Sequence, residues 1–511
     1  MKIRTFRIVT QNIDRLAAAF IFFGATAASE GRQVLVGQRP PDFSTWFDIE
    51  RYLASAHAFW HGNLSASVHL YPLLYPLLLA AFAWLPTFYM TLFPDVLCYV
   101  ATLVGFQMVA ARLGIGRWGA LLLFLPATVA YFTGGMWLWP WNTTLSAALI
   151  WLALGFACEI GDWQGGSSPD LRRYAMLGVL LGLIPLCRPA DVVVSGMIGV
   201  CLLPLLLVRP RRWRELGAII TGALVPMAAY LALYLAIYGP RLNDYISGTT
   251  DAGFNFAWLG WKSYLLLIEP RPWYPYGAGL FLVMPWLPVG LAGLLLAFTE
   301  RETRWLAALL TLPALAYAVV MLSYIDFLPS GLWAMKNAHY FKWLLPLFTL
   351  LAWWWLSQVR RRLVAAALAL VLALLPTCVR YEPVPAAEEA PARLVVFSRP
   401  KDSFGHIYWG SSVVTDRAGP QFNVLDVHLV PDKRGLVLAE ALRRPFLGDE
   451  QWLWPATDPL HRIGARYAVL HYVPNGSFRR RAIARYRRAF SFGWPCWLPP
   501  YACPLTLPPG P

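Results

Sequence analysis

A polar stretch between two apolar segments carries the side chains best suited to chemistry. It reads FDIERYLASAHAFWHGN and holds two acids, an arginine and two histidines. Charged groups beside long apolar segments are costly to place, so they are functional candidates. Two of them, His57 and His61, are four residues apart and could bind a metal from one helix face. No third ligand is evident nearby, so the sequence favours another role for this pair.

The elements that must position these side chains are apolar helices. The chain has 511 residues, of which 58% are hydrophobic and 14% are charged, whereas about 25% are charged in a typical soluble domain. Apolar runs of about 15 to 25 residues recur, long enough to approach the thickness of a bilayer. Backbone groups in lipid must be satisfied internally, so these runs are expected to be helices. The sequence predicts a polytopic α-helical membrane protein.

Basic residues set the expected orientation of the spans. The N-terminal segment carries Lys2, Arg4, Arg7 and Arg15, which places the N-terminus in the cytoplasm. Under a count of about eleven spans, every arginine-rich short loop falls on the same side, which explains the net charge of +15 without nucleic acid. No A-x-A-like site follows the first run, so we expect a retained anchor. The expected spans are 14–34, 88–111, 118–133, 143–160, 174–187, 191–208, 216–238, 277–298, 305–324, 343–357 and 363–377.

An odd number of spans leaves the C-terminal part on the outer face. We expect a membrane domain over 1–378 with an outer loop at 35–87, a Pro/Ala/Glu linker at 379–393, and a small extracytoplasmic α/β domain over 394–511. Within the last, LVVFS, SSVVT, FNVLDVHLV and ARYAVLHYV predict strands, and GLVLAEALRR and RRRAIARYRR predict helices. Outside the cytoplasm, Cys496 and Cys503 could form a disulfide.

Several segments, taken in order, resemble a known enzyme family. The first loop reads D-x-x-x-Y from Asp48 to Tyr52, with Gly62 fourteen residues after Asp48. It is followed by YPLLYPLLLAAFAWLP, GVLLGLIPLCRPADVVV, YLAIYGPRLNDY and HYFKWLLPLF. Over about 30–350 this order resembles the C-type (GT-C) glycosyltransferases, in particular their polyprenyl-phosphate-dependent, mannosyltransferase-like branch. The chain departs from the pattern with Leu for a second Pro in the Tyr-Pro segment, and with His and Lys for Arg in the last segment.

The resemblance implies a reaction and a base. A hexosyl- or pentosyltransferase of this kind moves a sugar from a polyprenyl-phosphate carrier to an outer-face lipid, glycan or protein acceptor, with inversion. The acceptor hydroxyl needs a general base, and the resemblance places that role on Asp48. Asp42 and Glu50 are the rival bases. The alternative is that Asp48 only caps its helix or pairs with Arg51.

The leaving phosphate would need fixed positive charge or donors. The resemblance makes Arg188 the first candidate, with an ion pair to Asp191 as the alternative. Lys336, His339 and Lys342 follow, with interfacial anchoring as their alternative. The sequence establishes no cofactor, and it leaves a divalent metal, Mg²⁺ or Mn²⁺, open. The remaining candidate substrate contacts are Tyr52, His57, His61 and Asn142, the last of which could instead be a helix cap.

A transporter or flippase of lipids or glycans is the alternative function. Proteins of that class tend to carry charges deep within their spans and internal repeats, and the sequence shows no convincing repeat; Asp95 is an exception among charges that mostly flank spans. A non-catalytic assembly partner with the same fold is a third possibility. In each case the expected location is the membrane, as a multi-pass protein of a bacterial inner (plasma) membrane.

Overall fold

The computed structural model describes most of the first 357 residues and part of the remainder. The described ranges are 12–45, 47–129, 136–161, 170–208, 212–243, 279–299, 304–324 and 337–357, short pieces between 245 and 268, and strands between 392 and 474. The chain folds as two compact units. The first comprises residues 1–243, 284–318 and 339–376, and the second comprises residues 244–283, 319–338 and 377–511.

Long apolar helices make up most of the described part, as the composition predicts. Five are long and apolar enough to cross a membrane: Thr87–Arg112, Asn142–Gly161, Pro189–Leu207, Trp213–Tyr238 and Arg304–Ser323. They coincide with expected spans, so the prediction of a mostly helical fold with apolar helices of membrane-spanning length is confirmed. The count of eleven stays a prediction, because the range 363–377 lies outside the described residues.

The helices of the N-terminal half follow the expected order. They are α2 (Ile13–Glu30), α3 (Arg32–Leu35), the 3-10 turn η1 (Asp42–Thr45), α4 (Phe47–Trp60), α5 (Leu74–Ala80), α6 (Thr87–Arg112), α7 (Arg117–Thr128) and α9 (Asn142–Gly161). The segment YPLLYPLLLAAFAWLP, which lies within the expected outer loop, forms only the short α5, followed by turns. Such a helix is too short to cross a bilayer.

The remaining helices are interrupted more often. They are α10 (Leu171–Cys187), η2 (Pro189–Asp191), α11 (Val192–Leu207), α12 (Arg212–Tyr238), α15 (Leu280–Val283), α16 (Trp286–Thr299), α17 (Arg304–Ser323), η4 (Asn337–Leu344) and α19 (Leu345–Ser357). The span expected at 277–298 is thus broken into α15 and α16. Lys342 belongs to the 3-10 segment η4, which precedes α19 directly.

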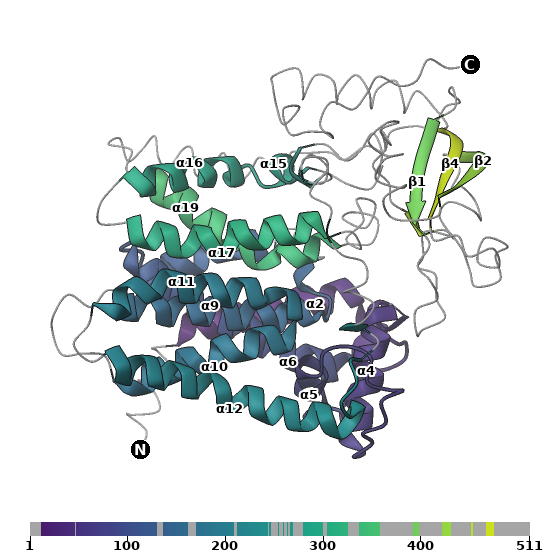
Figure 1. Ribbon diagram of the computed structural model, residues 1–511, viewed down its shortest axis with the longest axis horizontal. Coiled ribbons are helices and arrows are strands. Elements are labelled where there is room, and N and C mark those ends of the chain that lie inside the picture. Colours follow the sequence, from purple (N-terminus) through teal and green to yellow (C-terminus); the bar gives the residue numbers. More distant parts are fainter. Residues whose placement is uncertain are drawn as a thin grey trace. The chain divides into compact units, whose positions relative to one another are not determined.

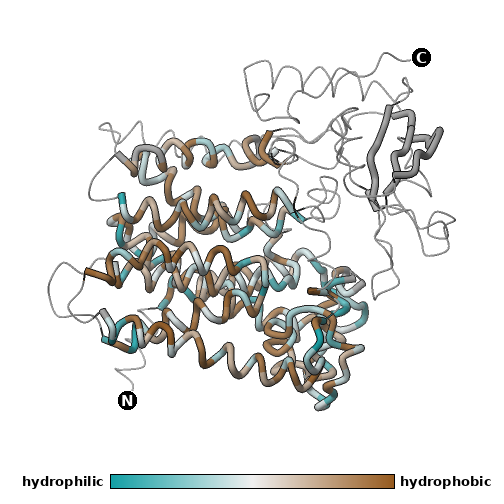
Figure 2. The backbone as a smooth tube through the Cα atoms, viewed as in Figure 1, coloured by the Kyte–Doolittle hydropathy of each residue, from teal (hydrophilic) through white to brown (hydrophobic). Residues whose placement is uncertain are grey.

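The long helices of the first unit lie side by side, and α4 lies across one end of them (Figure 1). The tube coloured by hydropathy is mostly brown along these helices and carries more teal around α4 (Figure 2). Chain direction places the start of α6 at the α4 end, and places its last residue and the start of α7 at the opposite end. The interior is aromatic: Trp137, Trp141, Trp151, Tyr75, Tyr99 and Tyr174 are among the most deeply buried side chains.

Helices α10 and α12 pack at close range through glycines. A Cβ atom on Gly178 would lie 2.0 Å from the carbonyl oxygen of Ile219, and one on Gly222 would lie 2.2 Å from that of Ala175. Both neighbours are backbone atoms, which cannot rotate away. Small residues at helix contacts allow this approach in membranes. The outward face of α12 carries exposed apolar side chains, including Leu224, Val225 and Leu231, as expected of a helix facing lipid.

Adding one methyl group at this contact is expected to loosen the pair. The Gly178→Ala substitution should cost about 1–3 kcal/mol, because the new Cβ overlaps a backbone carbonyl. Gly217→Ala is the matched control on α12, since nothing lies within 4 Å of its Cβ position; there the better helix propensity of Ala should leave stability equal or higher. Thermal unfolding of both purified variants in detergent checks this. Equal melting temperatures would contradict the close packing.

Four strands are described in the C-terminal part. They are β1 (Ala392–Phe397), β2 (Phe422–Val430), β3 (Gln451–Trp452) and β4 (Tyr467–Pro474), in the order β2-β4-β1-β3. Strand β4 is antiparallel to β1 and β2, and β1 is parallel to β3. Strands β1, β2 and β4 overlap three of the expected strands. The strand SSVVT, both expected helices, the linker 379–393, Cys496 and Cys503 lie outside the described residues.

Candidate functional site

Helix α4 presents Asp48 at the end of the bundle. Its apolar side is buried through Ile49, Leu53 and Ala56, whose spacing matches one face of a helix. Asp48 and Glu50 lie in the first turn, where the helix dipole favours negative charge. Asp48 is partly buried, whereas Glu50 is exposed. Of these two candidate bases, only Asp48 is enclosed by protein on one side. The side chain of the third, Asp42 in η1, is outside the described residues.

A tyrosine from the next segment holds Asp48. The hydroxyl of Tyr71 donates a short hydrogen bond to Oδ1 of Asp48 across 23 residues of sequence. Tyr71 itself is buried, with 7% of its surface exposed. Hydrogen bonds to a carboxylate are stronger than neutral ones, so this contact fixes the orientation of the acid. The sequence pattern marked Asp48 but not Tyr71; the repeated Tyr-Pro in YPLLYP was the available signal.

Tyr52 supports this contact from inside. Its ring lies 5.0 Å from the ring of Tyr71 and 5.4 Å from that of Tyr75, the latter edge-on. It is only 3% exposed. Tyr52, a candidate substrate contact by sequence, therefore packs between the two tyrosines of YPLLYP and positions the residue that holds Asp48.

A second acid lies deeper, between helices. The hydroxyl of Tyr75 donates to Oδ1 of Asp95 on α6 at 2.9 Å. Asp95 interacts electrostatically with Lys342. The ammonium group of Lys342 donates to Oγ1 of Thr144 at 2.6 Å and to the carbonyl oxygen of Met136 at 3.3 Å. Both charged side chains are almost fully buried. Lys342 is therefore an internal group and not the interfacial anchor that the sequence allowed.

Arg188 forms the ion pair that the sequence offered as its alternative role. Its Nη1 lies 3.3 Å from Oδ1 of Asp191 and donates to the Tyr317 hydroxyl at 3.0 Å. The guanidinium group also covers the ring of Tyr340, 4.5 Å from its centroid. Asp191 in turn accepts a short hydrogen bond from Ser146. Arg188 is thus compensated within the protein, and it joins α10 to α17 and η4.

His339 lies next to this pair. Its ring stacks on Trp141 at 4.1 Å with an interplanar angle of 8°, and Nδ1 is 3.0 Å from Oγ1 of Thr143. Its other nitrogen, Nε2, is buried and has no hydrogen-bond partner in the described part of the chain. A buried polar atom of this kind is a candidate contact for a ligand.

The other sequence candidates are scattered. His57 and His61 are both exposed. Asn142 is buried at the start of α9, and its carbonyl oxygen accepts from the Cys187 thiol at 3.3 Å. Lys336 lies outside the described residues. Within the described ranges, no three His, Cys, Asp or Glu side chains gather as a metal site requires.

A buried histidine that the sequence did not single out fastens the loop after α4. His69 Nδ1 lies 2.7 Å from the hydroxyl of Ser55, and Nε2 lies 2.8 Å from the carbonyl oxygen of Asn63. A carbonyl can only accept, so Nε2 carries the proton and Nδ1 accepts from Ser55. The ring stacks on Phe59 at 4.2 Å. We call Ser55, Asn63 and His69 the His69 clasp.

Acid is expected to loosen the His69 clasp. Burial lowers the pKa of His69, with a smaller opposing effect from the hydrogen bond to Asn63. Because the pKa of His69 is lower in the folded chain than in the unfolded chain, the neutral ring stabilises the fold fully above the pKa of the unfolded chain, about 6.5. This stabilisation is lost as the pH falls through the pKa of the folded chain. Hydrogen exchange over residues 61–73, corrected for the intrinsic rate, should therefore rise below about pH 6.5.

Two variants separate this effect from other titrations. His69→Asn should raise exchange in the loop at neutral pH and remove its dependence on pH. The exposed neighbours His57 and His61 are matched controls, and the double variant H57Q/H61Q should keep the wild-type pH response. A response that disappears in H57Q/H61Q and persists in His69→Asn would overturn the assignment.

Comparison of the chain with models of protein families, with curated proteins and with solved structures finds no match in any of the three.

Proposed function

We propose that the chain is a membrane glycosyltransferase that moves a sugar from a polyprenyl-phosphate carrier to an acceptor hydroxyl. The observation that supports it most is Asp48, partly buried at the start of α4, oriented by Tyr71, and situated where α4 lies across the end of a helical bundle. A carboxylate held in place at such an end suits a substrate presented at the membrane surface. The resemblance carried by the order of the sequence segments supports this reaction class.

In this proposal Asp48 acts as general base. The acceptor oxygen attacks the anomeric carbon while its proton passes to the carboxylate of Asp48. The bond between the anomeric carbon and the phosphate oxygen breaks, and polyprenyl phosphate leaves with the electron pair. Attack from the face opposite the phosphate inverts the configuration. Tyr71 keeps the carboxylate in one orientation, which a positioned base requires.

Recognition of the phosphate is assigned first to His339. Its Nε2 is one of the buried side-chain atoms that have no hydrogen-bond partner among the described residues, and Lys336 precedes η4 in the sequence. Arg188 is compensated by Asp191, so we assign it to holding Tyr340, which follows His339, and not to the phosphate directly.

The proposal includes an orientation. The α4 end of the bundle faces the outside of a bacterial plasma membrane, and the N-terminus and the arginine-rich loops face the cytoplasm. Eleven spans would place the strands β1 to β4 on the outer face, as an extracytoplasmic domain. Cysteine labelling of Glu50→Cys, which is exposed, with a reagent that does not cross membranes tests this orientation in intact cells.

Transport is the second candidate, and one observation favours it. Asp95, Arg188, Asp191 and Lys342 are all buried between helices. Buried charges within membrane helices mark ion and substrate pathways in many transporters. Here Arg188 pairs with Asp191, while Asp95 and Lys342 are held by hydroxyl and carbonyl groups, so a structural role explains them equally well.

Reconstitution separates the two functions. The purified full chain in sealed vesicles is supplied with a polyprenyl-phosphate-linked sugar, or with lipids extracted from the source membrane, together with a candidate acceptor. A transferase consumes the donor, releases polyprenyl phosphate and labels the acceptor. A transporter moves the labelled lipid between leaflets and leaves it intact. Flipping without donor consumption would reject the proposed function.

A further inference from the structure

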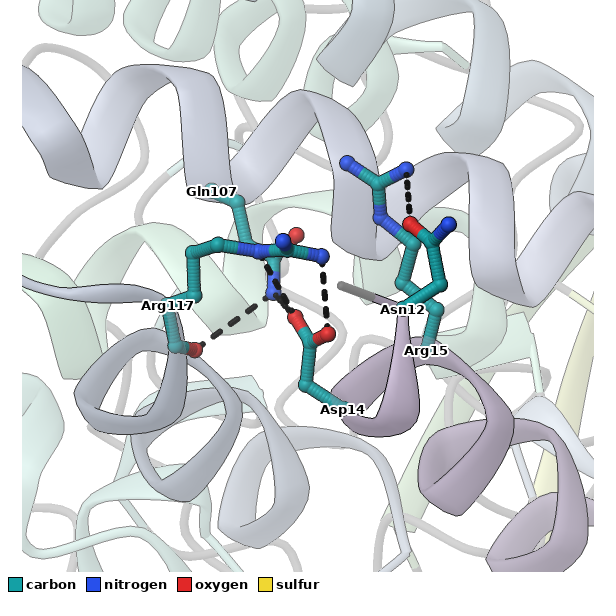
Figure 3. Close-up of polar contacts among 5 residues, drawn as sticks. All are labelled: Asn12, Asp14, Arg15, Gln107 and Arg117. Atoms are coloured by element: carbon teal, nitrogen blue, oxygen red, sulfur yellow. Dashed lines mark hydrogen bonds and ion pairs between the residues drawn. The ribbon is translucent and has the colours of Figure 1, made fainter. Parts of the chain in front are cut away.

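A charged cluster at the end of the bundle opposite α4 takes no part in the proposed reaction. It comprises Asn12, Asp14, Arg15, Gln107 and Arg117 (Figure 3); we call it the Asp14 cluster. These residues come from the start of α2, the last part of α6 and the start of α7. The cluster therefore joins three helices at one end of the bundle.

Asp14 is the buried centre of the cluster. Arg117 binds its carboxylate with two donors, Nη2 to Oδ1 at 2.8 Å and Nε to Oδ2 at 3.1 Å. The side-chain amide of Gln107 donates to Oδ2 at 2.6 Å. Asp14 has 3% of its surface exposed, whereas 44% of the Arg117 side chain is exposed. One edge of the Arg117 guanidinium group is thus fixed on Asp14 while much of the side chain remains accessible.

The positive charge of the cluster exceeds the negative charge. Arg15 lies close enough to Arg117 for the two cations to repel each other, and the single carboxylate of Asp14 lies between α2 and α7. Arg15 donates one hydrogen bond, from Nη1 to Oδ1 of Asn12 at 3.0 Å. Its Nε is buried and has no hydrogen-bond partner among the described residues. A second cation with an unused buried donor is costly unless an anion binds there.

The surfaces beside the cluster are apolar and exposed. Helix α2 exposes Leu16 and Phe20, the latter with 74% of its surface accessible, and α7 exposes Trp118 and Leu122. Helices α2 and α7 are in contact with each other. A ligand bound here would therefore contact positive charge at the ends of α2 and α7 and apolar side chains further along these helices. That combination matches a phospholipid with an anionic headgroup.

We propose that Arg15 and Arg117 bind the phosphodiester headgroup of an anionic phospholipid of the phosphatidylglycerol class, whose acyl chains lie along α2 and α7. Free phosphate has the same charge chemistry but would leave the apolar faces unused. The lipid would come from the leaflet that borders the ends of α2 and α7 distant from α4. This site is independent of the proposed function and holds whether or not the chain transfers sugars.

Lipid exchange on the purified full chain tests the proposal. Detergent-stripped protein is titrated with phosphatidylglycerol, phosphatidylcholine or inorganic phosphate, and bound lipid is counted by native mass spectrometry together with the melting temperature. Phosphatidylglycerol should bind and raise the melting temperature, and the other two should not. Arg15→Gln should weaken retention of phosphatidylglycerol about fivefold, as expected for the loss of one arginine at a membrane surface. The loss should go no further, because the contact between Asp14 and Arg117 is left intact.

Arg172→Gln is the matched control. Arg172 lies in the first turn of α10, at the same end of the bundle, and its side chain is 93% exposed. The Arg172→Gln variant also removes one positive charge, but away from the Asp14 cluster, and it should bind phosphatidylglycerol as the wild type does. Equal losses in both variants would mean general surface attraction and would overturn the site. So would equal binding of phosphatidylcholine, or stabilisation by inorganic phosphate alone.

Discussion

Asp48→Asn is expected to abolish sugar transfer while the chain still folds and inserts. A positioned general base contributes about 10²–10⁴-fold to such a step, and the amide of Asn cannot take up the proton of the acceptor. Asn keeps the size of the side chain and a carbonyl oxygen that can still accept from Tyr71, so the contact seen at Oδ1 has a substitute. The measurement is release of polyprenyl phosphate in vesicles, normalised to folded protein.

Glu50→Gln is the matched control for this prediction. Glu50 lies in the same first turn of α4 but is exposed, so its variant should retain activity close to that of the wild type. Tyr71→Phe should fall between the two, because it removes a hydrogen bond to a charged group, worth about 1.5–3 kcal/mol, but keeps the base. Full activity of Asp48→Asn, or loss of activity only in Glu50→Gln, would contradict the assignment of Asp48.

The positions of the long helices could be predicted from the sequence because apolar length alone determines them. The range expected at 88–111 matches α6 and that at 143–160 matches α9, each within two residues at either end. The span expected at 277–298 failed in detail, since α15 and α16 are separate helices. Hydropathy sums over a window and does not register where backbone geometry interrupts a helix.

The site was less predictable, because its contacts join residues far apart in sequence. Asp48 could be found from a local pattern, but Tyr71 lies 23 residues away. For Arg188 the sequence offered both a phosphate and an ion pair with Asp191, and the structure contains the ion pair. Arg188 and Asp191 are three residues apart, so an ion pair was possible whether or not Arg188 also contacts a phosphate. The burial of Arg188 and Asp191 favours the ion pair over the phosphate contact, and this burial depends on neighbouring helices.

Lys342 illustrates the same limit most clearly. At the end of an expected outer loop, a lysine is ordinarily an interfacial anchor. Instead its ammonium group is held by Thr144 and Met136, from segments about 200 residues earlier in the chain. Its negative counterpart, Asp95, comes from a third segment. No sequence pattern within one of these segments predicts that it will contact the other two.

Removing one of the two opposite buried charges, Asp95 or Lys342, should be more damaging than removing both. Lys342→Met leaves Asp95 buried without the opposing charge of the lysine, and the cost should lie below the about 3–5 kcal/mol of breaking a directly bonded buried ion pair. Asp95→Asn keeps the hydrogen bond from Tyr75 but leaves the ammonium group uncompensated. The double variant D95N/K342M has no buried charge at this place. We expect its melting temperature to exceed that of Lys342→Met, despite the lost hydrogen bonds to Thr144 and Met136.

The wild type, the two single variants and the double variant form a double-mutant cycle, which also bears on function. A coupling free energy of about 0.5–3 kcal/mol is usual for interacting residues, and additive effects would show that Asp95 and Lys342 do not interact. Thr144→Val, which removes only the hydrogen bond at 2.6 Å, controls for the loss of polar contacts. If the pair serves structure, D95N/K342M should transfer sugar once it is folded. If the pair lies on a transport pathway, the double variant should be stable yet inactive, because a pathway needs the charges themselves and not merely their balance.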